Sequence, residues 1–387
     1  MDFSFTEEQD AIRETARRFA TDRLAPGFQE READGILPKD LILEMGALGL
    51  IGVDIPEEYG GLGLGRMECG IVAEEISRAD LSLGYVILNT SLLGSMLATH
   101  ANPDITRQAL ARVVKGETTG MALGLTEPRG GSDAAGLIVK ARREGDDRYI
   151  LNGEKTSISL INQSEEIVVL ARTGEVEDRA RSVTAFLVPL DAPGVSVTTF
   201  DDLGSKTVGR GSVFFDDVEV PMERRIGEEN EGFRQIMNGF DYSRAIIGLQ
   251  VLGPAQASLD ETWDYITQRE AFGTPIAKFQ GVTEPLATAE TQVAAARLLC
   301  YKTLWLRDQN LRHTSEAAMC KWWAPKLAFE VIHRCLITHG HFGYSTDLPH
   351  QQRMRDVLGL QIGDGTEQIM KMIISRERIG RIAVPYD

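Results

Sequence analysis

Cysteine is scarce in this sequence of 387 residues, which contains only four. No two of them form a Cys-x-x-Cys pair, and each stands in an apolar stretch with helix-like surroundings; they are Cys69, Cys300, Cys320 and Cys335. This distribution argues against a disulfide framework and against a thiolate metal site. We therefore expect buried free thiols in a reducing compartment, for which the cytoplasm is the default.

Net positive charge is also lacking. The chain carries 41 Lys and Arg against 57 Asp and Glu, a formal charge of -16, and no run of Lys and Arg relieves it locally. Such a surface would repel phosphate backbones and anionic lipid headgroups. The composition predicts a soluble protein whose partners include neither nucleic acid nor a membrane surface.

A long apolar run is the third feature that we do not find. The chain opens MDFSFTEEQD, without a basic, apolar leader. We also expect no segment to approach the roughly 20 apolar residues that cross a bilayer. On this interpretation nothing exports or anchors the protein.

What the chain does have is length and apolar content. The hydrophobic fraction is 43%, and 387 residues exceed the size at which one core usually stops growing, so two or three domains are expected. Residues 1–118 predict a helical domain, because Thr6 and Gln9 form a capping-box signature before apolar residues at helical spacing. One glycine-rich loop, VDIPEEYGGLGLG, interrupts this domain.

The remaining chain divides into a β region and a second helical region, which makes the fold class α+β. Residues 119–228 contain short segments rich in β-branched and aromatic residues, and a hairpin is expected at Asn152-Gly153, a pair suited to a type I′ turn. Residues 229–387 predict long helices of an antiparallel bundle. Pro254 and Pro325 lie inside them and should kink or interrupt them.

Two polar segments could bind a ligand. In LTEPRGGSD (125–133), small residues let backbone N–H groups approach a ligand, and Thr126 and Ser132 add hydroxyl donors; a plain connection is the competing interpretation. In REAFGTPIAKFQ (269–280), Arg269 could bind a phosphate and Phe272 could pack on a planar ring. The alternative there is a helix-ending arginine and a core phenylalanine.

Two further segments carry titratable groups. His339 and His341 stand in a glycine turn without a nearby third metal ligand of clear spacing, so backbone contact with a cofactor through Gly340 and Gly343 is the better supported role. Asp364 stands between Gly363 and Gly365, directly before a helical pattern. A helix cap is the simplest role for this acid.

Taken together, these segments resemble the acyl-CoA dehydrogenase family across essentially the whole chain. The motifs, in the family's order, are LTEP-x-x-GSD at 125–133, LNG-x-K at 151–155, R-x-x-FG-x-PI-x-x-FQ at 269–280, G-x-x-GY at 340–344, RD at 355–356 and GT at 365–366. The resemblance implies a helical N-terminal domain (1–118), a central β-barrel (119–228) and a C-terminal four-helix bundle (229–387). It also implies FAD in a cleft between them and a homotetramer.

The resemblance implies a role for each matched residue. Residues implied to contact FAD are Leu125, Thr126, Ser132, Ser157, Ser159, Thr366 and Gln368 of one subunit, with Gly340 at the adenosine part and Arg269, Phe272 and Gln280 coming from a neighbouring subunit. Residues implied to contact the acyl-CoA are Ser132, Asp241, Arg244, Gly363 and Gly365. Many relatives have a tryptophan at the position of Ser157. Its loss either opens the flavin edge to a different electron acceptor or leaves room for another side chain.

The family removes a proton from the α-carbon and a hydride from the β-carbon of an acyl thioester, giving a 2-enoyl-CoA and reduced flavin. A base must therefore lie within hydrogen-bond reach of the α-carbon, and donors must face the thioester oxygen. Most relatives use a glutamate in a Tyr-Glu-Gly-Thr setting, where this chain has Gly-Asp-Gly-Thr. The resemblance makes Asp364 the catalytic base, with a pKa raised by partial burial. Some relatives carry the base elsewhere, but that position is Ser243 here, which cannot be a strong base.

These departures shape the expected substrate. Aspartate reaches roughly 1.3 to 1.5 Å less far than glutamate, a difference large enough to affect catalysis. Gly363 also removes an aromatic side chain common in relatives, so we expect a cyclic or α-branched acyl group, as in cyclohexane- and cyclohexene-carboxyl-CoA dehydrogenases. A short or medium straight-chain acyl group is the alternative. Electron-transferring flavoprotein is the usual acceptor in such families.

Other classes remain open on this fold. An acyl-CoA oxidase would use the same base and pass electrons to oxygen. A flavin monooxygenase would need no carboxylate at position 364, so Asp364 argues against it. A non-catalytic scaffold would be expected to lose the base or the FAD contacts, and neither is missing.

Overall fold

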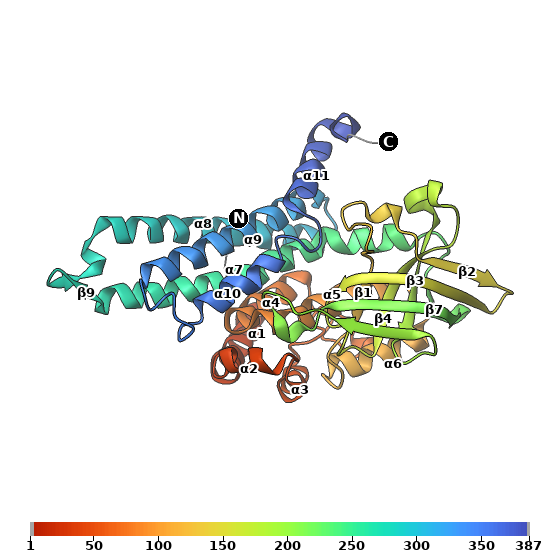
Figure 1. The fold of residues 1–387 in the computed structure, drawn as a ribbon, viewed down its shortest axis with the longest axis horizontal. Coiled ribbons are helices and arrows are strands. Elements are labelled where there is room, and N and C mark those ends of the chain that lie inside the picture. Colours follow the sequence, from red (N-terminus) through yellow and green to blue (C-terminus); the bar gives the residue numbers. More distant parts are fainter. Residues whose placement is uncertain (1–3, 385–387) are drawn as a thin grey trace.

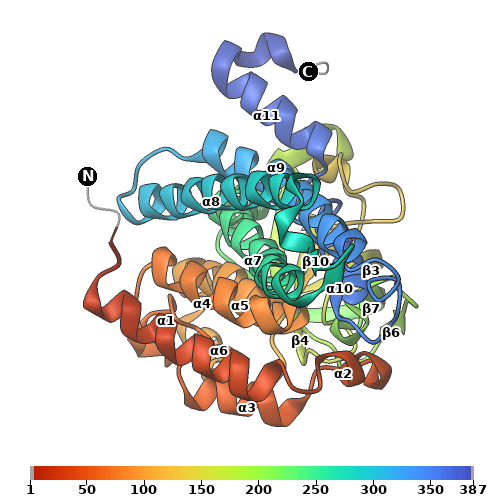
Figure 2. The ribbon, with the colours of Figure 1, turned by 90° about the vertical axis from the view of Figure 1, so that its left-hand side faces the viewer.

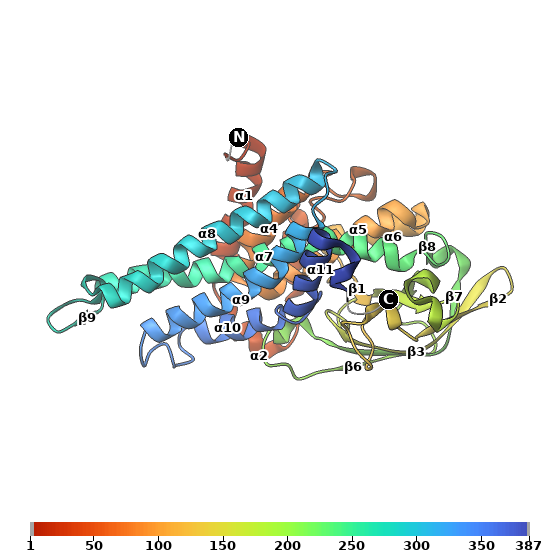
Figure 3. The ribbon, with the colours of Figure 1, turned by 90° about the horizontal axis from the view of Figure 1, so that it is seen from above.

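A computed structural model describes residues 4–384. Helices come first, a β region follows, and long helices complete the chain (Figure 1), so the predicted α+β class is confirmed. The view in Figure 3 shows the sheet and the long helices side by side along the longest axis of the molecule.

The N-terminal region is helical, as predicted. Its helices are α1 (Glu7–Phe19), α2 (Phe28–Asp34), α3 (Lys39–Ala47), α4 (Arg66–Ala79), α5 (Leu81–His100) and α6 (Pro103–Val114), with a π-helical turn at Ala20–Leu24. The capping box is confirmed, because Gln9 N donates to Thr6 Oγ1 at 3.2 Å and Thr6 N donates to Gln9 Oε1 at 3.1 Å. These bonds satisfy backbone groups that the start of α1 would otherwise leave unpaired.

Helix α5 corrects one expectation. It is 20 residues long, and a window of mean hydropathy 1.5 makes it the one helix among the described residues that is long and apolar enough to cross a membrane. The expectation that no segment would approach this length is therefore wrong. In the fold, 83% of that window is buried, because α4, α6 and α7 (Gly232–Gln268) pack around it. Its all-round apolar surface is that of a core helix.

The central region forms one mixed sheet. Its strands are β1 (Ala122–Gly124), β2 (Lys140–Glu144), β3 (Arg148–Ile158), β4 (Glu166–Arg172), β5 (Val183–Pro189), β6 (Val195–Thr199), β7 (Gly211–Pro221) and β8 (Arg225–Ile226). Neighbours follow the order β6-β7-β3-β2-β4-β5-β8, and β1 pairs with β4. Over the described residues the end strands β6 and β8 do not pair with each other, so hydrogen bonding does not close the sheet into a barrel. Its inward side chains form a separate core that includes Val169, Phe186 and Val213.

The hairpin expected at Asn152-Gly153 is wrong. Both residues lie inside β3, where the pairing with β7 shifts register between Leu151 and Gly153. The φ of Gly153 is +130°, and a Cβ there would lie 3.0 Å from Val139 Cγ2, so the glycine serves a β-bulge and not a turn. The chain turns instead at residues 145–147, between β2 and β3.

The C-terminal region contains the long helices α7, α8 (Gln280–Asp308) and α9 (Thr314–Thr338), followed by α10 (His350–Gly359) and α11 (Glu367–Ile379). A small hairpin of β9 (Glu270–Ala271) and β10 (Thr274–Pro275) joins α7 to α8. Helices α7 and α9 continue through Pro254 and Pro325, so the expected interruptions do not occur. Helix α11 packs against Ala318 of α9 through Met370 and Ile373, and its C-terminal end projects from the bundle (Figure 2).

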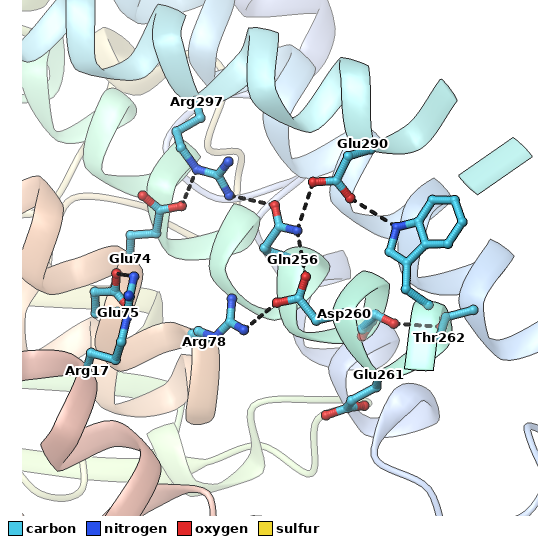
Figure 4. A network of polar contacts seen from close by, with 12 residues as sticks. Arg17, Glu74, Glu75, Arg78, Gln256, Asp260, Glu261, Thr262, Glu290 and Arg297 are labelled. Atoms are coloured by element: carbon cyan, nitrogen blue, oxygen red, sulfur yellow. Dashed lines mark hydrogen bonds and ion pairs between the residues drawn. The ribbon is translucent and has the colours of Figure 1, made fainter. Parts of the chain in front are cut away.

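Buried side chains join the two helical regions. Figure 4 shows Glu74 of α4 accepting from Arg297 Nε of α8 at 2.6 Å, while Arg297 Nη2 donates to Gln256 Oε1 of α7 at 2.9 Å. Gln256 Nε2 then donates to Asp260 and Glu290. All four cysteines are buried and unpaired, as predicted.

Candidate active site

Asp364 lies in the turn between α10 and α11. Its φ of +55° is in the left-handed region, which aspartate tolerates better than most residues, and Gly365 follows with φ +105°. Asp364 is not the helix cap, because Thr366 occupies that position and its Oγ1 accepts from Ile369 N at 3.5 Å. The simplest role suggested by the sequence is therefore taken by a different residue, and the Asp364 carboxyl is left for another function.

Two buried cations hold the backbone on either side of this turn. Arg244 Nε donates to the carbonyl oxygen of Asp364 at 3.4 Å, and Lys321 Nζ donates to that of Gly365 at 3.2 Å. Arg244 comes from α7 and Lys321 from α9, and they are only 6% and 1% exposed. The segment is thus fixed through its carbonyls, which leaves the carboxyl oxygens without a direct protein partner among the described residues.

The charges shift one another's ionisation. Burial raises the pKa of Asp364, and the Lys321 and Arg244 cations oppose this rise. Burial lowers the pKa of Lys321 to about 8, against the attraction of the Asp364 carboxylate. A carboxylate with a raised pKa is a stronger base than an exposed aspartate and remains able to ionise.

Asp241 and Arg244 form a second polar pair beside the turn. Arg244 Nη1 lies 3.6 Å from Asp241 Oδ1, and Thr314 Oγ1 donates to Asp241 Oδ2 at 2.7 Å. The Arg244 guanidinium also lies over the Phe240 ring, 5.7 Å from its centroid. The structure therefore brings together Asp364, predicted as the base, and three of the residues predicted to contact the substrate, Asp241, Arg244 and Gly365.

The LTEP segment follows β1 and is held by a buried ion pair. Lys155 Nζ donates to Glu127 Oε1 at 2.8 Å and to the Leu125 carbonyl at 3.0 Å. Glu127 also accepts from Ile138 N and Val139 N at 2.7 and 2.8 Å. Both residues stood within matched motifs, but nothing in the sequence showed that their side chains would meet.

Three predicted hydroxyls remain open to a ligand. The Thr126 carbonyl accepts from Thr156 N at 2.9 Å, which places the LTEP segment beside the end of β3, near Ser159. Over the residues described, the hydroxyls of Thr126, Ser132 and Ser159 make no hydrogen bond to protein; Thr126 and Ser159 are half-buried and Ser132 is exposed. Open hydroxyls beside a glycine-containing loop suit a polar, planar ligand.

Ser157 and Arg210 lie next to the LTEP segment, at the end of β3. Ser157 has φ +60°, is exposed, and its Oγ accepts from Arg210 Nη1 at 2.7 Å. Arg210 also pairs with Asp202 and lies over the Phe200 ring, 5.1 Å from its centroid. The Arg210 side chain therefore reaches Ser157, as the second alternative for this position requires.

Tyr85 of α5 was not identified from the sequence. Burial raises its pKa, and the Asp364 and Asp356 carboxylates raise it further, while Arg210 lowers it. Tyr85 therefore lies within electrostatic reach of both the Asp364 turn and the Arg210 side chain. An aromatic residue inside an apolar helix gives no sequence signal for such a position.

A second set of predicted residues lies elsewhere. Arg269, Phe272 and Gln280 surround the β9–β10 hairpin, at the end of the long helices farthest from the sheet (Figure 1). Phe272 is 97% exposed with φ +55°, so the alternative of a core phenylalanine is wrong. Within one chain these residues do not join the Asp364 turn.

The turn that contains His339 and His341 lies at the same end of the long helices as the β9–β10 hairpin. His339 stacks on Tyr265 of α7 with ring centroids 4.2 Å apart, and Gly340 has φ +61° and open space at its Cβ position. A Cβ at Gly343 would lie 1.9 Å from the Leu336 carbonyl oxygen, so this glycine is required for packing. The described residues contain no group of three or more His, Cys, Asp or Glu side chains arranged to hold a metal ion.

Thr366 and Gln368 stand at the start of α11, two and four positions beyond Asp364. A hollow of about 790 Å³ lies in another place, between α6 and the start of β4, and it contains none of the predicted site residues.

Comparison with known families matches three consecutive parts of the chain. The acyl-CoA dehydrogenase N-terminal, middle and C-terminal domain families match residues 6–117, 122–218 and 230–379. The chain therefore belongs to the acyl-CoA dehydrogenase family and is an FAD-dependent enzyme. The open hydroxyls of Thr126 and Ser159 fit the polar atoms of a flavin.

Individual relatives cover almost the whole chain. The 3-(aryl)acrylate reductase of Clostridium sporogenes is 35% identical, over 96% of this chain and 98% of its own length. The mitochondrial short-chain specific acyl-CoA dehydrogenase of Mus musculus is 34% identical, over 95% and 89%. The caffeyl-CoA reductase-Etf complex subunit CarC of Acetobacterium woodii is 33% identical, over 96% and 98%.

A solved structure shows the same fold. Butyryl-CoA dehydrogenase from Megasphaera elsdenii superimposes with a TM-score of 0.94 at 32% identity, covering 98% of this chain and 100% of that one. The arrangement of two helical regions around a sheet is thus common to both.

Proposed function

We propose that the protein catalyses α,β-dehydrogenation of an acyl-CoA thioester with Asp364 as the base. The observation that supports this most directly is that Asp364 is held through backbone carbonyls by Arg244 and Lys321, while its carboxyl is free. Its raised pKa suits proton abstraction near neutral pH.

The proposed reaction divides between chain and cofactor. Asp364 would accept the proton from the α-carbon, and the chemistry that FAD would supply is acceptance of the hydride from the β-carbon. Arg244 and Lys321 keep the segment that carries Asp364 in place. This limits displacement of the base, which would lower the rate of proton transfer. Asp364 is half-buried and lies beside the buried Arg244 and Lys321 side chains, where interactions between charges are stronger than in bulk water.

The acyl group that we propose is cyclic or α-branched, such as cyclohexane- or cyclohexene-carboxyl. Aspartate is shorter than glutamate by one methylene, about 1.5 Å, so the α-carbon has to approach more closely. A Cβ at Gly363 would meet only the Gly359 carbonyl oxygen, 3.9 Å away, so this position is open. Both features favour a bulky group at the α-carbon.

A short straight-chain acyl group is the second candidate. It is favoured by two of the related proteins, the short-chain specific dehydrogenase and butyryl-CoA dehydrogenase. These relatives cover 95% or more of this chain, and so do the aryl-acrylate and caffeyl-CoA reductases, whose names include ring-bearing substrates.

We propose binding roles for the remaining predicted residues. Leu125, Thr126, Ser132, Ser157, Ser159, Thr366 and Gln368 would contact FAD in the same chain, and Ser132, Asp241, Arg244, Gly363 and Gly365 the acyl-CoA. Arg269, Phe272 and Gln280 would contact the FAD of another copy in a homotetramer, and Gly340 would approach the adenosine part of FAD. The exposure of Phe272, at the end farthest from the sheet, supports a role between subunits.

An electron-transferring flavoprotein is the proposed acceptor and the cytoplasm the proposed location. The caffeyl-CoA reductase relative is named as part of an Etf complex. Four buried, unpaired cysteines suit a reducing compartment.

The function is tested by mixing the FAD-loaded protein anaerobically with cyclohexanecarboxyl-CoA, isobutyryl-CoA, butyryl-CoA and octanoyl-CoA. Loss of the flavin absorbance identifies accepted thioesters, and the first two should bleach it fastest. If butyryl-CoA is fastest, the straight-chain candidate replaces the cyclic one. Bleaching by none of them would contradict the dehydrogenase reaction, and rapid reoxidation with peroxide on admitting air would identify an oxidase.

A further inference from the structure

Lys321 is buried without the partners that a buried cation normally has. Its side chain is 1% exposed, and among the described residues its one hydrogen-bond acceptor is the Gly365 carbonyl, at 3.2 Å. Within residues 4–384 no carboxylate forms an ion pair with Lys321, although its charge interacts with Asp364 and Arg244. Burying an ammonium group with one neutral acceptor costs free energy of folding. A role in stability alone therefore does not explain a lysine at this position.

The position of Lys321 relative to Asp364 gives the cation a use. Gly365 has φ +105°, a backbone conformation that residues with a Cβ rarely adopt, so this backbone path favours glycine. That path directs the Gly365 carbonyl to Lys321, one peptide unit beyond the Asp364 carbonyl that Arg244 holds. Lys321 of α9 and Arg244 of α7 thus donate to the carbonyls of two consecutive residues.

We propose that Lys321 is a positioning residue for the base, which sets both the location of Asp364 and its ionisation. This inference rests on the proposed function of Asp364. The Gly365 bond fixes the turn, and the ammonium charge favours the carboxylate form against the cost of burial. The charged groups that face Lys321 are Asp364, on the turn before α11, and Arg244, on α7. Lys321 accepts no proton from substrate and touches no reacting atom.

A purely structural lysine would behave differently. Loss of a structural tie between α9 and α11 would lower the unfolding temperature and leave the ionisation of Asp364 unchanged. Loss of a positioning cation moves the pH dependence of the base upward, because ionised Asp364 loses a favourable neighbour. The pH profile therefore separates the two roles.

The experiment compares Lys321→Met, Lys321→Gln and Lys321→Arg with wild type in the FAD-loaded protein. Lys321→Met removes the bond and the charge, Lys321→Gln keeps a donor without the charge, and Lys321→Arg keeps the charge. Lys326→Met is the matched control, since Lys326 lies on α9 and is half-buried but does not face Asp364. Each variant is checked for FAD content and helical content before use.

We expect Lys321→Met to lower kcat/KM at least 10-fold and to move the acidic limb of its pH profile upward by at least half a pH unit. Lys321→Gln should show the same movement with a smaller loss of rate, and Lys321→Arg and Lys326→Met should keep the wild-type limb. If Lys321→Met does not fold, the Lys321→Gln profile decides the question. An unmoved limb in the folded neutral variant overturns the proposal.

A second readout is independent of turnover. Acetoacetyl-CoA ionises at its acidic α-carbon without hydride transfer, and its enolate is followed by ultraviolet absorbance as pH is raised. The transition should occur at higher pH in Lys321→Met than in wild type, and coincident transitions contradict the proposal. Asp364→Asn is measured in parallel: if it keeps the wild-type rate, the function of Asp364 fails, whereas a dead Asp364→Asn beside a normal Lys321→Met removes only the role of Lys321.

Discussion

Lys155 and Glu127 form an ion pair inside the protein, with Nζ and Oε1 2.8 Å apart and side-chain exposures of 0% and 4%. Lys155 also holds the Leu125 carbonyl, and Glu127 holds two backbone amides after the LTEP segment. The pair therefore fixes the loop whose hydroxyls we assign to FAD. Burial lowers the pKa of Lys155 to about 8, against the attraction of Glu127.

Lys155→Met should destabilise the protein and weaken FAD binding together. It leaves Glu127 buried without its counterion, which typically costs about 3 kcal/mol or more in unfolding free energy. Urea denaturation and FAD content after dialysis measure the two effects. The double variant Lys155→Met, Glu127→Gln should recover part of the stability. A single variant with unchanged unfolding and full FAD would show that the pair is dispensable.

Asp364→Asn should keep FAD and thioester binding while lowering turnover by roughly three orders of magnitude, the scale of general base catalysis. Asparagine has the shape of aspartate and cannot take the proton. Stopped-flow bleaching measures the rate, and flavin spectra with bound thioester confirm binding. Asp364→Glu should favour butyryl-CoA over cyclohexanecarboxyl-CoA relative to wild type, because the longer arm fills the open region at Gly363. If the preference between the two thioesters is unchanged, the open position at Gly363 does not select the acyl group.

Asp356 should make stability depend on pH. It is 2% exposed, Ser205 N donates to its Oδ1 at 2.5 Å, and burial raises its pKa to about 7. A folded pKa above the unfolded value near 4 means that the folded state holds the proton more tightly. The stabilising contribution is complete below pH 4 and is lost as pH rises through about 7.

Asp356→Asn is therefore expected to be more stable than wild type at pH 8, by up to about 4 kcal/mol, and equal to it near pH 4. Guanidinium denaturation of the FAD-loaded protein at the two pH values measures this difference. Asp264→Asn, at an exposed position on α7, is the matched control. Equal stability of Asp356→Asn and wild type at both pH values would contradict the prediction.

Arg210→Met should change electron transfer more than substrate oxidation. If Arg210 lies at the flavin edge through its bond to Ser157, its charge favours the anionic reduced flavin, and its loss lowers the midpoint potential. Anaerobic dye titration measures the potential, and bleaching by thioester should stay within about twofold, since the base is untouched. Arg148→Met, an equal change of charge at a half-buried site on β3, is the control. A potential identical in both variants would place Arg210 away from the flavin.

The local parts of the fold were predictable because they depend on neighbours in sequence. Thr6 and Gln9 are three residues apart, so their capping box could be recognised directly. The prediction at Asn152-Gly153 was wrong because it also used neighbours in sequence alone, and this pair permits a tight turn. In the fold Asn152 bonds Asp217 of β7 and Gly153 lies against Val139. Long-range pairing therefore determined the conformation. The apolar residues of α5 met the length of a membrane span, and only the helices packed around it show that it is a core helix.

The sequence by itself determined the family, the three consecutive regions and the acid at position 364, because motif residues and their order are properties of the chain alone. Tertiary structure decided what holds that acid. Lys321 and Arg244 are 77 residues apart along the chain and reach adjacent carbonyls only when α7 and α9 pack together. Side chains so distant in sequence leave no local pattern, since their meeting depends on the packing of whole helices.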